Sequence, residues 1–135
     1  MYLGIDFGKK RIGLAFGSMI PVGIGIIDAT KDKSEIVQEI KKICLERDAE
    51  KIIIGLPTLT SGDEGNLAKE VREFASMLEL ELGLEVILEP EGFTSVEAAE
   101  ILKEQGKYYD KKSGKLDELA AVLILEQYIN SLKTN

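Results

Sequence analysis

The chain has 135 residues, of which 44% are hydrophobic and 30% charged, a composition typical of one folded domain and not of a disordered chain. Its 24 acidic residues outnumber its 17 basic ones, so any binding to nucleic acid must use a local basic patch. The absence of histidine excludes imidazole catalysis and histidine-ligated zinc, and the single cysteine excludes an internal disulfide. We expect no signal peptide or membrane span, and a cytoplasmic location.

The first part of the chain has the period of β-strands. Apolar residues alternate with small or polar ones in three segments, residues 2–6, 11–17 and 22–27. In the third segment, Val22, Ile24 and Ile26 are expected to share one face. Short turns separate the segments, which predicts an antiparallel meander.

The rest of the chain alternates between helical and strand patterns. Asp32 and Glu35 resemble a capping box that opens a helix to about residue 48. Further strands are predicted at residues 51–56 and 85–89, and further helices at 67–78, 94–102 and 117–132. Residues 1–135 are therefore expected to form a single α/β domain. We predict a mixed five-stranded sheet, three strands antiparallel and two parallel, flanked by helices on both faces.

Three carboxylates lie where such a sheet places its active site. Asp6 ends the first strand, Glu91 follows the fifth, and Asp117 opens the last helix. Each has an ordinary alternative: a turn residue, a solvated loop acid and a helix N-cap. If the three converge, they form an oxygen-ligand site for Mg²⁺, because without a cation they would repel one another. Such an ion could catalyse phosphodiester hydrolysis.

Basic residues flank two of these acids. Three follow Asp6 and four precede Asp117, namely Lys9, Lys10, Arg11, Lys107, Lys111, Lys112 and Lys115, with Tyr108 and Tyr109 beside the second group. Lysines for phosphates and tyrosines for base stacking suit a nucleic-acid groove. The ordinary alternative is a solvated loop.

Two other features have candidate roles. The loop at residues 57–65 is either a flap over the site, with Gly62 and Gly65 as hinges, or a simple connection between strand and helix. It is not a phosphate-binding P-loop, because the Gly-Lys-Ser/Thr ending is absent. Cys44 lies on the apolar side of the first helix and is expected in the core.

Four sequence blocks closely resemble the YqgF/RuvX family of small bacterial RNase H-like proteins, described as pre-16S rRNA nucleases and Holliday junction resolvases. The blocks are GIDFGKKRIG, IIIGLP followed by SGDEG, PEGFTSVEA, and LDELAAVLILEQY. The resemblance implies an RNase H-like fold, Mg²⁺ or Mn²⁺ dependence, and metal binding by Asp6, Glu91 and Asp117. Gly92 replaces the family's usual Arg and Leu59 its usual Asn, which affects substrate positioning.

Three functions follow as alternatives. The first is a metal-dependent endonuclease that acts on structured RNA, the pre-16S rRNA. The second is a resolvase of branched, four-way DNA, which would act as a homodimer because two strands must be cut. The third is a catalytically weak RNA-binding factor in ribosome assembly, which the missing Arg and the acidic charge favour. An actin-like ATPase reading of GIDFG is disfavoured, since that fold needs two such domains.

Overall fold

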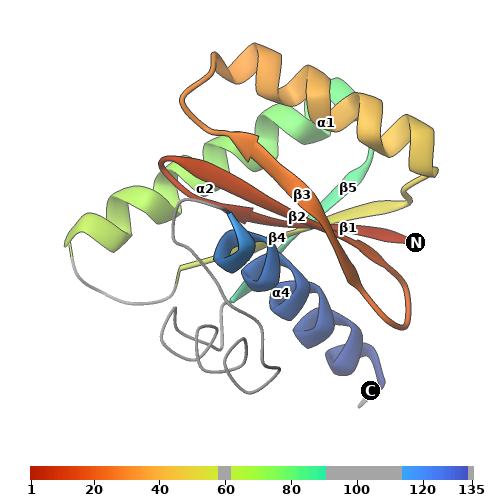
Figure 1. The fold of residues 1–135 in the computed structure, drawn as a ribbon. Helices are drawn as coiled ribbons and strands as arrows, with labels where there is room; N and C mark the ends of the chain where they lie inside the picture. The colour runs from red at the N-terminus through yellow and green to blue at the C-terminus, as the bar shows by residue number, and fades with distance from the viewer. Residues whose placement is uncertain (58–61, 91–113, 134–135) are drawn as a thin grey trace.

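The computed structural model describes residues 1–57, 62–90 and 114–133, with the side chains of residues 62–65 excepted. Within these residues, a central sheet is covered by two helices on one face and by a third on the other (Figure 1). The elements in chain order are β1 (Tyr2–Phe7), β2 (Arg11–Gly17), β3 (Val22–Asp28), α1 (Lys33–Arg47), β4 (Lys51–Leu56), α2 (Gly62–Leu82), β5 (Glu85–Pro90) and α4 (Lys115–Lys133). The helix expected at residues 94–102 lies outside the described residues.

The sheet has five strands in the order β3-β2-β1-β4-β5. The pairs β1–β2 and β2–β3 are antiparallel, whereas β1–β4 and β4–β5 are parallel. The predicted meander and the predicted mixed sheet are therefore confirmed. Because β1, β4 and β5 run in the same direction, their carboxyl ends lie at one edge of the sheet.

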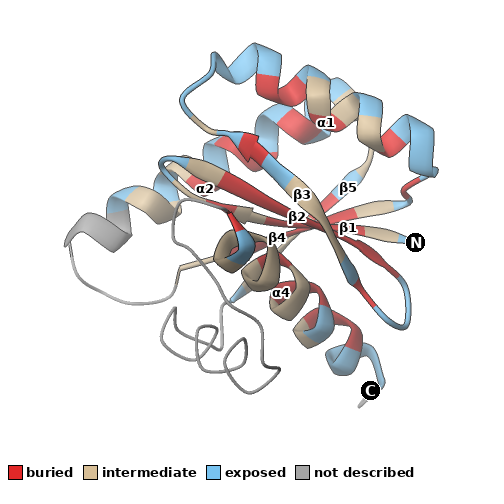
Figure 2. Ribbon diagram, viewed as in Figure 1, coloured by how far each residue is buried: buried red, intermediate tan, exposed pale blue. Residues whose placement is uncertain are grey.

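The two faces of the sheet have separate cores. On one, which we call the α1/α2 face, side chains such as Leu3, Ile5 and Ile12 pack against α1 and α2. Figure 2 shows buried positions along the strands and on these two helices. On the other, the α4 face, Ala15 and Ile53 pack against the buried side of α4. This division follows the period of a strand, because successive residues point to opposite faces.

An irregularity in β3 changes the face on which its later residues lie. Leu14 pairs with Gly25 but Ala15 pairs with Gly23, so Ile24 is an extra residue in the ladder. Gly25 has a φ of 124°, a conformation that favours glycine. As a result Ile27 is buried, whereas Ile26 is 38% exposed and lies against Gly114 at the start of α4. The expectation that Ile26 shares a face with Val22 and Ile24 is wrong for this reason.

One predicted helix cap and one predicted helix start also need correction. Asp32 is the N-cap of α1, but its side chain makes no capping hydrogen bond; it accepts one from the Ser34 hydroxyl instead, at 3.3 Å. Helix α2 already begins at Gly62. Gly62 and Gly65 are thus helical positions and not the hinges of a flap, and the connection from β4 is short. None of the helices in the described ranges combines the length and apolarity that a membrane span requires.

Candidate active site

Asp6 lies on the α4 face near the carboxyl end of β1. Gly4, two residues earlier and so on the same face, lies directly beneath α4. A Cβ atom at Gly4 would be 3.0 Å from both the Ala121 carbonyl oxygen and the Leu125 Cβ. The half-buried Asp6 side chain therefore points to the side of the sheet that α4 covers.

Gly13 brings the first turn of α4 next to Asp6. Gly13 on β2 pairs directly with Asp6, and the Cα atoms of such antiparallel partners are about 5 Å apart. A Cβ atom at Gly13 would lie only 1.9 Å from the carbonyl oxygen of Asp117. Glycine is thus required for the helix backbone to contact the sheet here. This contact brings the backbone of Asp117 close to Asp6, although the two residues are 111 positions apart in the sequence.

Asp117 occupies the first turn of α4, where the helix dipole favours a carboxylate. It is the third residue of the helix, so the alternative role of N-cap does not apply. Its Oδ2 accepts a hydrogen bond from Nε of Arg11 at 2.8 Å, within an ion pair. The Asp117 and Arg11 side chains are only 24% and 30% exposed. The structure therefore gives Arg11, predicted to contact nucleic acid, an acidic partner within the protein.

Glu91, the third predicted carboxylate, lies outside the described residues. The strand that leads to it ends at Pro90, level with Leu56 at the end of β4. The side-chain amide of Gln127 on α4 donates a hydrogen bond to Glu89 Oε1 at 3.1 Å and another to the Pro90 carbonyl oxygen. The end of β5 is therefore tied to the helix that carries Asp117.

The residues present suit a hard divalent cation. Two half-buried carboxylates, Asp6 and Asp117, supply the oxygen ligands that Mg²⁺ and Mn²⁺ prefer. Within residues 1–57, 62–90 and 114–133, no group of three or more Cys, Asp or Glu side chains is close enough to hold a metal ion. Of the three predicted ligands, Asp6 and Asp117 lie within the described residues and Glu91 does not.

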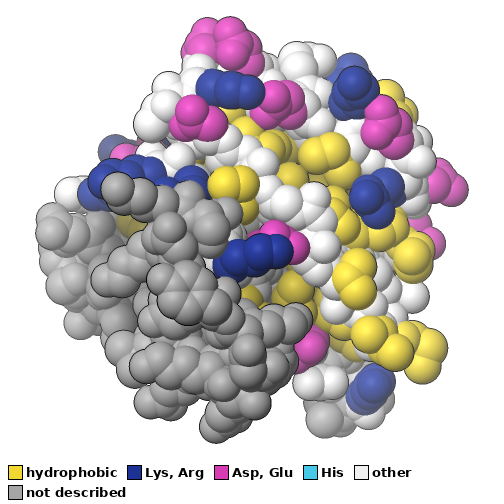
Figure 3. Space-filling view, viewed as in Figure 1, with side chains coloured by type: hydrophobic (Ala, Val, Ile, Leu, Met, Phe, Trp, Pro, Cys, Tyr) yellow, Lys and Arg dark blue, Asp and Glu magenta, His cyan; other side chains and the backbone are white. Residues whose placement is uncertain are grey.

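The predicted nucleic-acid-binding residues fall into two sets. Lys9 and Lys10 are exposed in the β1–β2 turn, which a hydrogen bond from the Gly8 amide to the Arg11 carbonyl oxygen closes at 3.1 Å. Lys115 is exposed at the start of α4. Lys107, Tyr108, Lys111 and Lys112 lie outside the described residues. Figure 3 shows basic side chains interspersed with acidic ones, so a phosphate-binding surface here would be local.

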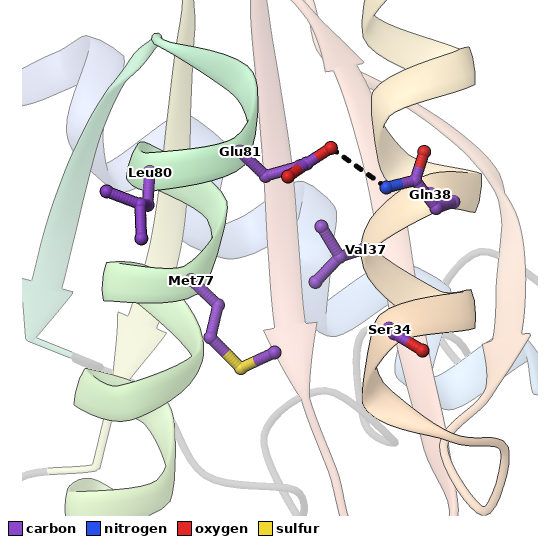
Figure 4. A pocket seen from close by; sticks show the side chains of 6 residues that line it. All are labelled: Ser34, Val37, Gln38, Met77, Leu80 and Glu81. Atoms are coloured by element: carbon purple, nitrogen blue, oxygen red, sulfur yellow. Dashed lines mark hydrogen bonds between the residues drawn. The ribbon is translucent and has the colours of Figure 1, made fainter.

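A groove between α1 and α2, on the opposite face of the sheet, is a poorer candidate. It has a volume of about 210 Å³ and is lined by Ser34, Val37, Gln38, Met77, Leu80 and Glu81 (Figure 4). Gln38 donates a hydrogen bond to Glu81 at 3.0 Å, which lowers the pKa of that carboxyl group. A largely apolar groove with an ionised acid at its rim does not suit a phosphate backbone.

Cys44 is confirmed as a core residue. Its side chain is buried on α1, and burial raises the pKa of its thiol to about 11. At neutral pH the thiol is protonated, so it is not an activated nucleophile.

Two features of the site were missed from the sequence. The pairing of Arg11 with Asp117 joins residues 106 positions apart, and no local pattern reports such a contact. The role of Gly13 could have been inferred from the sequence. When β1 and β2 are paired as a hairpin, Gly13, on the face of β2 that carries small residues, lies opposite Asp6. Such a glycine indicates close approach of another backbone.

Comparisons with known proteins identify the family of the chain. A family model described as "RuvX: Holliday junction resolvase" matches residues 1–131. A Crocosphaera subtropica protein named "Putative pre-16S rRNA nuclease" is 37% identical over 136 residues, covering 98% of this chain and 94% of the relative. A Chlamydia pneumoniae protein of the same name is 38% identical, covering 97% and 90%.

The fold is similar to that of a resolvase of known structure. Thermus thermophilus RuvC, solved in complex with a Holliday junction substrate, aligns with a TM-score of 0.62 over 98% of this chain and 95% of that one. At 12% identity, this likeness concerns the fold alone, and it confirms the expected RNase H-like class. Together with the match of the family model over nearly the whole sequence, it follows that the chain belongs to the RuvX family.

Proposed function

We propose that this protein is a metal-dependent endonuclease that cleaves a phosphodiester bond of pre-16S rRNA. The observation that carries the proposal is the glycine contact between β2 and α4, which brings the backbone of Asp117 onto Gly13, the residue paired with Asp6. Glu91 follows the last described residue of β5 and would be the third carboxylate. The names of the relatives supply the substrate.

In this mechanism the chain's own residues hold and shield the reacting groups. Asp6, Asp117 and Glu91 would bind Mg²⁺ or Mn²⁺, which supplies water activation and stabilises the charge that develops on the phosphate. Lys9, Lys10 and Lys115 are exposed beside the site and would bind the phosphates on either side of the cleaved bond. We expect Lys107, Lys111, Lys112 and Tyr108 to extend this surface, with Tyr108 stacking on a base.

Nuclease assays on carboxylate variants test the proposal. Asp6→Asn, Asp117→Asn and Glu91→Gln keep side-chain size but remove a charged oxygen ligand. We expect each to slow Mg²⁺-dependent cleavage of a pre-16S rRNA transcript by about 100-fold or more, because the ion supplies several kcal/mol of transition-state stabilisation. Circular dichroism would verify that each variant is folded.

A matched control is Asp48→Asn. Asp48 is exposed and ends α1 in the left-handed conformation with a φ of 57°, which asparagine also adopts readily. This variant changes the net charge by the same amount but should cleave like the wild type. Cleavage that persists in Asp6→Asn, or in excess chelator, would contradict the proposed mechanism.

The family model's description favours a second candidate, a Holliday junction resolvase. That function requires two active sites on one four-way DNA junction, and therefore a dimer on the DNA. Assays of the same preparation on a junction and on the rRNA transcript, with sedimentation of the protein–DNA complex, would distinguish the two. Symmetric cleavage of the junction by a dimer would favour the resolvase, and RNA binding without metal-dependent cleavage would favour an assembly factor.

A further inference from the structure

We propose that Arg11 is a positioning residue that neutralises Asp117 in the metal-free protein and competes there with the divalent cation. The ion pair joins Arg11 Nε to Asp117 Oδ2 at 2.8 Å. The inference rests on the proposed metal site and concerns how tightly that site binds its ion.

The backbone holds Arg11 on the sheet beneath the first turn of α4. Arg11 is the first residue of β2, pairs with Asp28 on β3, and accepts the hydrogen bond that closes the turn from Gly8. It lies two residues before Gly13 and hence on the same face, beneath the first turn of α4. The guanidinium therefore approaches Asp117 from the sheet while the helix is held by the Gly13 contact.

This pair differs from an ordinary surface ion pair because it is partly shielded from water. Its side chains are 30% and 24% exposed, whereas the Lys51 and Glu85 side chains of an outer pair are 38% and 62% exposed. Shielding strengthens the attraction between guanidinium and carboxylate. It equally strengthens the repulsion between that guanidinium and a divalent cation that binds the same carboxylate.

The ion pair stabilises the metal-free protein. Neighbouring carboxylates without a cation repel one another. A guanidinium on Asp117 relieves this repulsion, so the first turn of α4 can remain packed on the sheet next to Asp6. Binding of the cation must then weaken the Arg11 contact or displace it, which lowers the affinity for the free ion.

Titration of the metal-free protein with Mn²⁺, followed by the electron paramagnetic resonance of the free ion, tests this inference without any measurement of cleavage. Removing the positive charge that pairs with Asp117, in Arg11→Gln, should lower the Kd for Mn²⁺ by about tenfold. Arg11→Lys keeps the charge and should stay within about threefold of the wild type. Arg11→Met, which keeps much of the aliphatic stem, is the second neutral variant in case Arg11→Gln folds poorly.

Lys10→Gln is the matched control. It removes the same charge from the adjacent position, but Lys10 is exposed and its charge is screened by solvent. Its Kd for Mn²⁺ should therefore change by less than about twofold. An equal effect of Lys10→Gln and Arg11→Gln would overturn the specific role of Arg11.

The possible failures are distinguishable. Wild-type protein that binds no Mn²⁺, or whose binding survives in Asp6→Asn, would overturn the proposed metal site and this inference with it. Wild-type binding that Asp6→Asn abolishes, combined with an unchanged or weaker affinity in both neutral Arg11 variants, would overturn only the competition. A double-mutant cycle of thermal unfolding with Arg11→Gln and Asp117→Asn, run without metal, should show that their effects are not additive.

Discussion

The α1/α2 face and the α4 face of the sheet are built from different residue types. On the first, branched aliphatic and aromatic side chains of β1 and β2 fill the space between the sheet and two helices. On the second, the same two strands present Gly4, Gly13 and Ala15, and the backbone of α4 comes into direct contact with the sheet. Large side chains hold the helices of one face at a distance, whereas glycines let a helix bring its polar first turn to the sheet.

The two faces therefore make different contributions: the α1/α2 face stabilises the fold, and the α4 face carries the candidate site. Buried apolar surface on the α1/α2 face contributes to the folding free energy without involving a charged group. On the α4 face, close contact brings the first turn of α4, which carries Asp117, next to the part of the sheet that carries Asp6. Carboxylates close to one another are unfavourable without a cation or a guanidinium to compensate. Substitutions on the first face should therefore change stability alone, and substitutions at the glycine contact should change stability and metal binding together.

The largest expected loss of stability comes from Phe74→Ala on the α1/α2 face. Phe74 is fully buried on α2, and its ring centroid is 4.8 Å from that of Phe7. The cavity left by the ring should lower the free energy of unfolding, measured with urea, by about 4 kcal/mol. Phe74→Leu, which retains most of the volume, should lose only about 1.5 kcal/mol.

The same variants test whether the two faces are independent. Under conditions in which Phe74→Ala is still folded, its Kd for Mn²⁺ should equal that of the wild type. A matching loss of Mn²⁺ affinity would show that packing on the α1/α2 face also positions Asp6, and the division between the faces would not hold.

A smaller loss, of about 3 kcal/mol, is expected for Gly13→Ala at the glycine contact. The new Cβ would be 1.9 Å from the Asp117 carbonyl oxygen, a backbone atom that cannot rotate away. Helix α4 must therefore shift, which moves Asp117 relative to Asp6. We expect weaker Mn²⁺ binding as well as lower stability in urea.

Gly83→Ala is the control for Gly13→Ala. Gly83 has a φ of 69° and no atom within 4 Å of its ideal Cβ position, so this substitution imposes backbone strain without overlap. It should lower the free energy of unfolding by about 1 kcal/mol and leave Mn²⁺ binding unchanged. If Gly13→Ala cost no more than Gly83→Ala, the close approach of α4 would not be what positions Asp117.

Much of the fold could be predicted from the sequence, because it depends on local periods. The alternation in β1 and β2 indicated which residues face each core, and Ile52, Ile53 and Ile54 indicated a strand covered on both faces. The features that failed depend on particular backbone conformations. The positive φ of Gly25 moved Ile26 to the other face, and the early start of α2 placed Gly62 inside a helix.

The candidate site was predictable in part. Asp6 was selected because it ends an apolar strand, and Asp117 because it opens an apolar helix that should be buried. The expected sheet order placed Asp6 and Glu91 at one edge, whereas the approach of Asp117 to Asp6 was only a condition of the predicted metal site. The partner of Asp117 could not be found in this way, since the contact with Arg11 depends on where α4 crosses β2. Gly13 determines this crossing point, because it lets the backbone of α4 contact β2. The sequence indicates this role only after the strands have been paired.

The smallest expected effect concerns Cys44, which tests how well the α1/α2 face is sealed. Burial raises the pKa of this thiol to about 11, whereas the pKa of a thiol in an unfolded chain is about 8.5. Between these values the unfolded chain releases a proton that the folded protein keeps. Stability should therefore fall as the pH rises from about 9 toward 11, and Cys44→Ala should lose this part of the pH dependence.

Reaction of the thiol with Ellman's reagent at pH 8 gives the direct measurement. Because the reagent needs both a thiolate and access, the folded protein should react at least about 100 times more slowly than the protein in urea. Fast reaction in the absence of urea would mean that α1 opens from the sheet on the time scale of the assay. The packing of large side chains would then not keep α1 closed on the sheet. The proposed contrast between a stable α1/α2 face and an α4 face that carries the site would not hold.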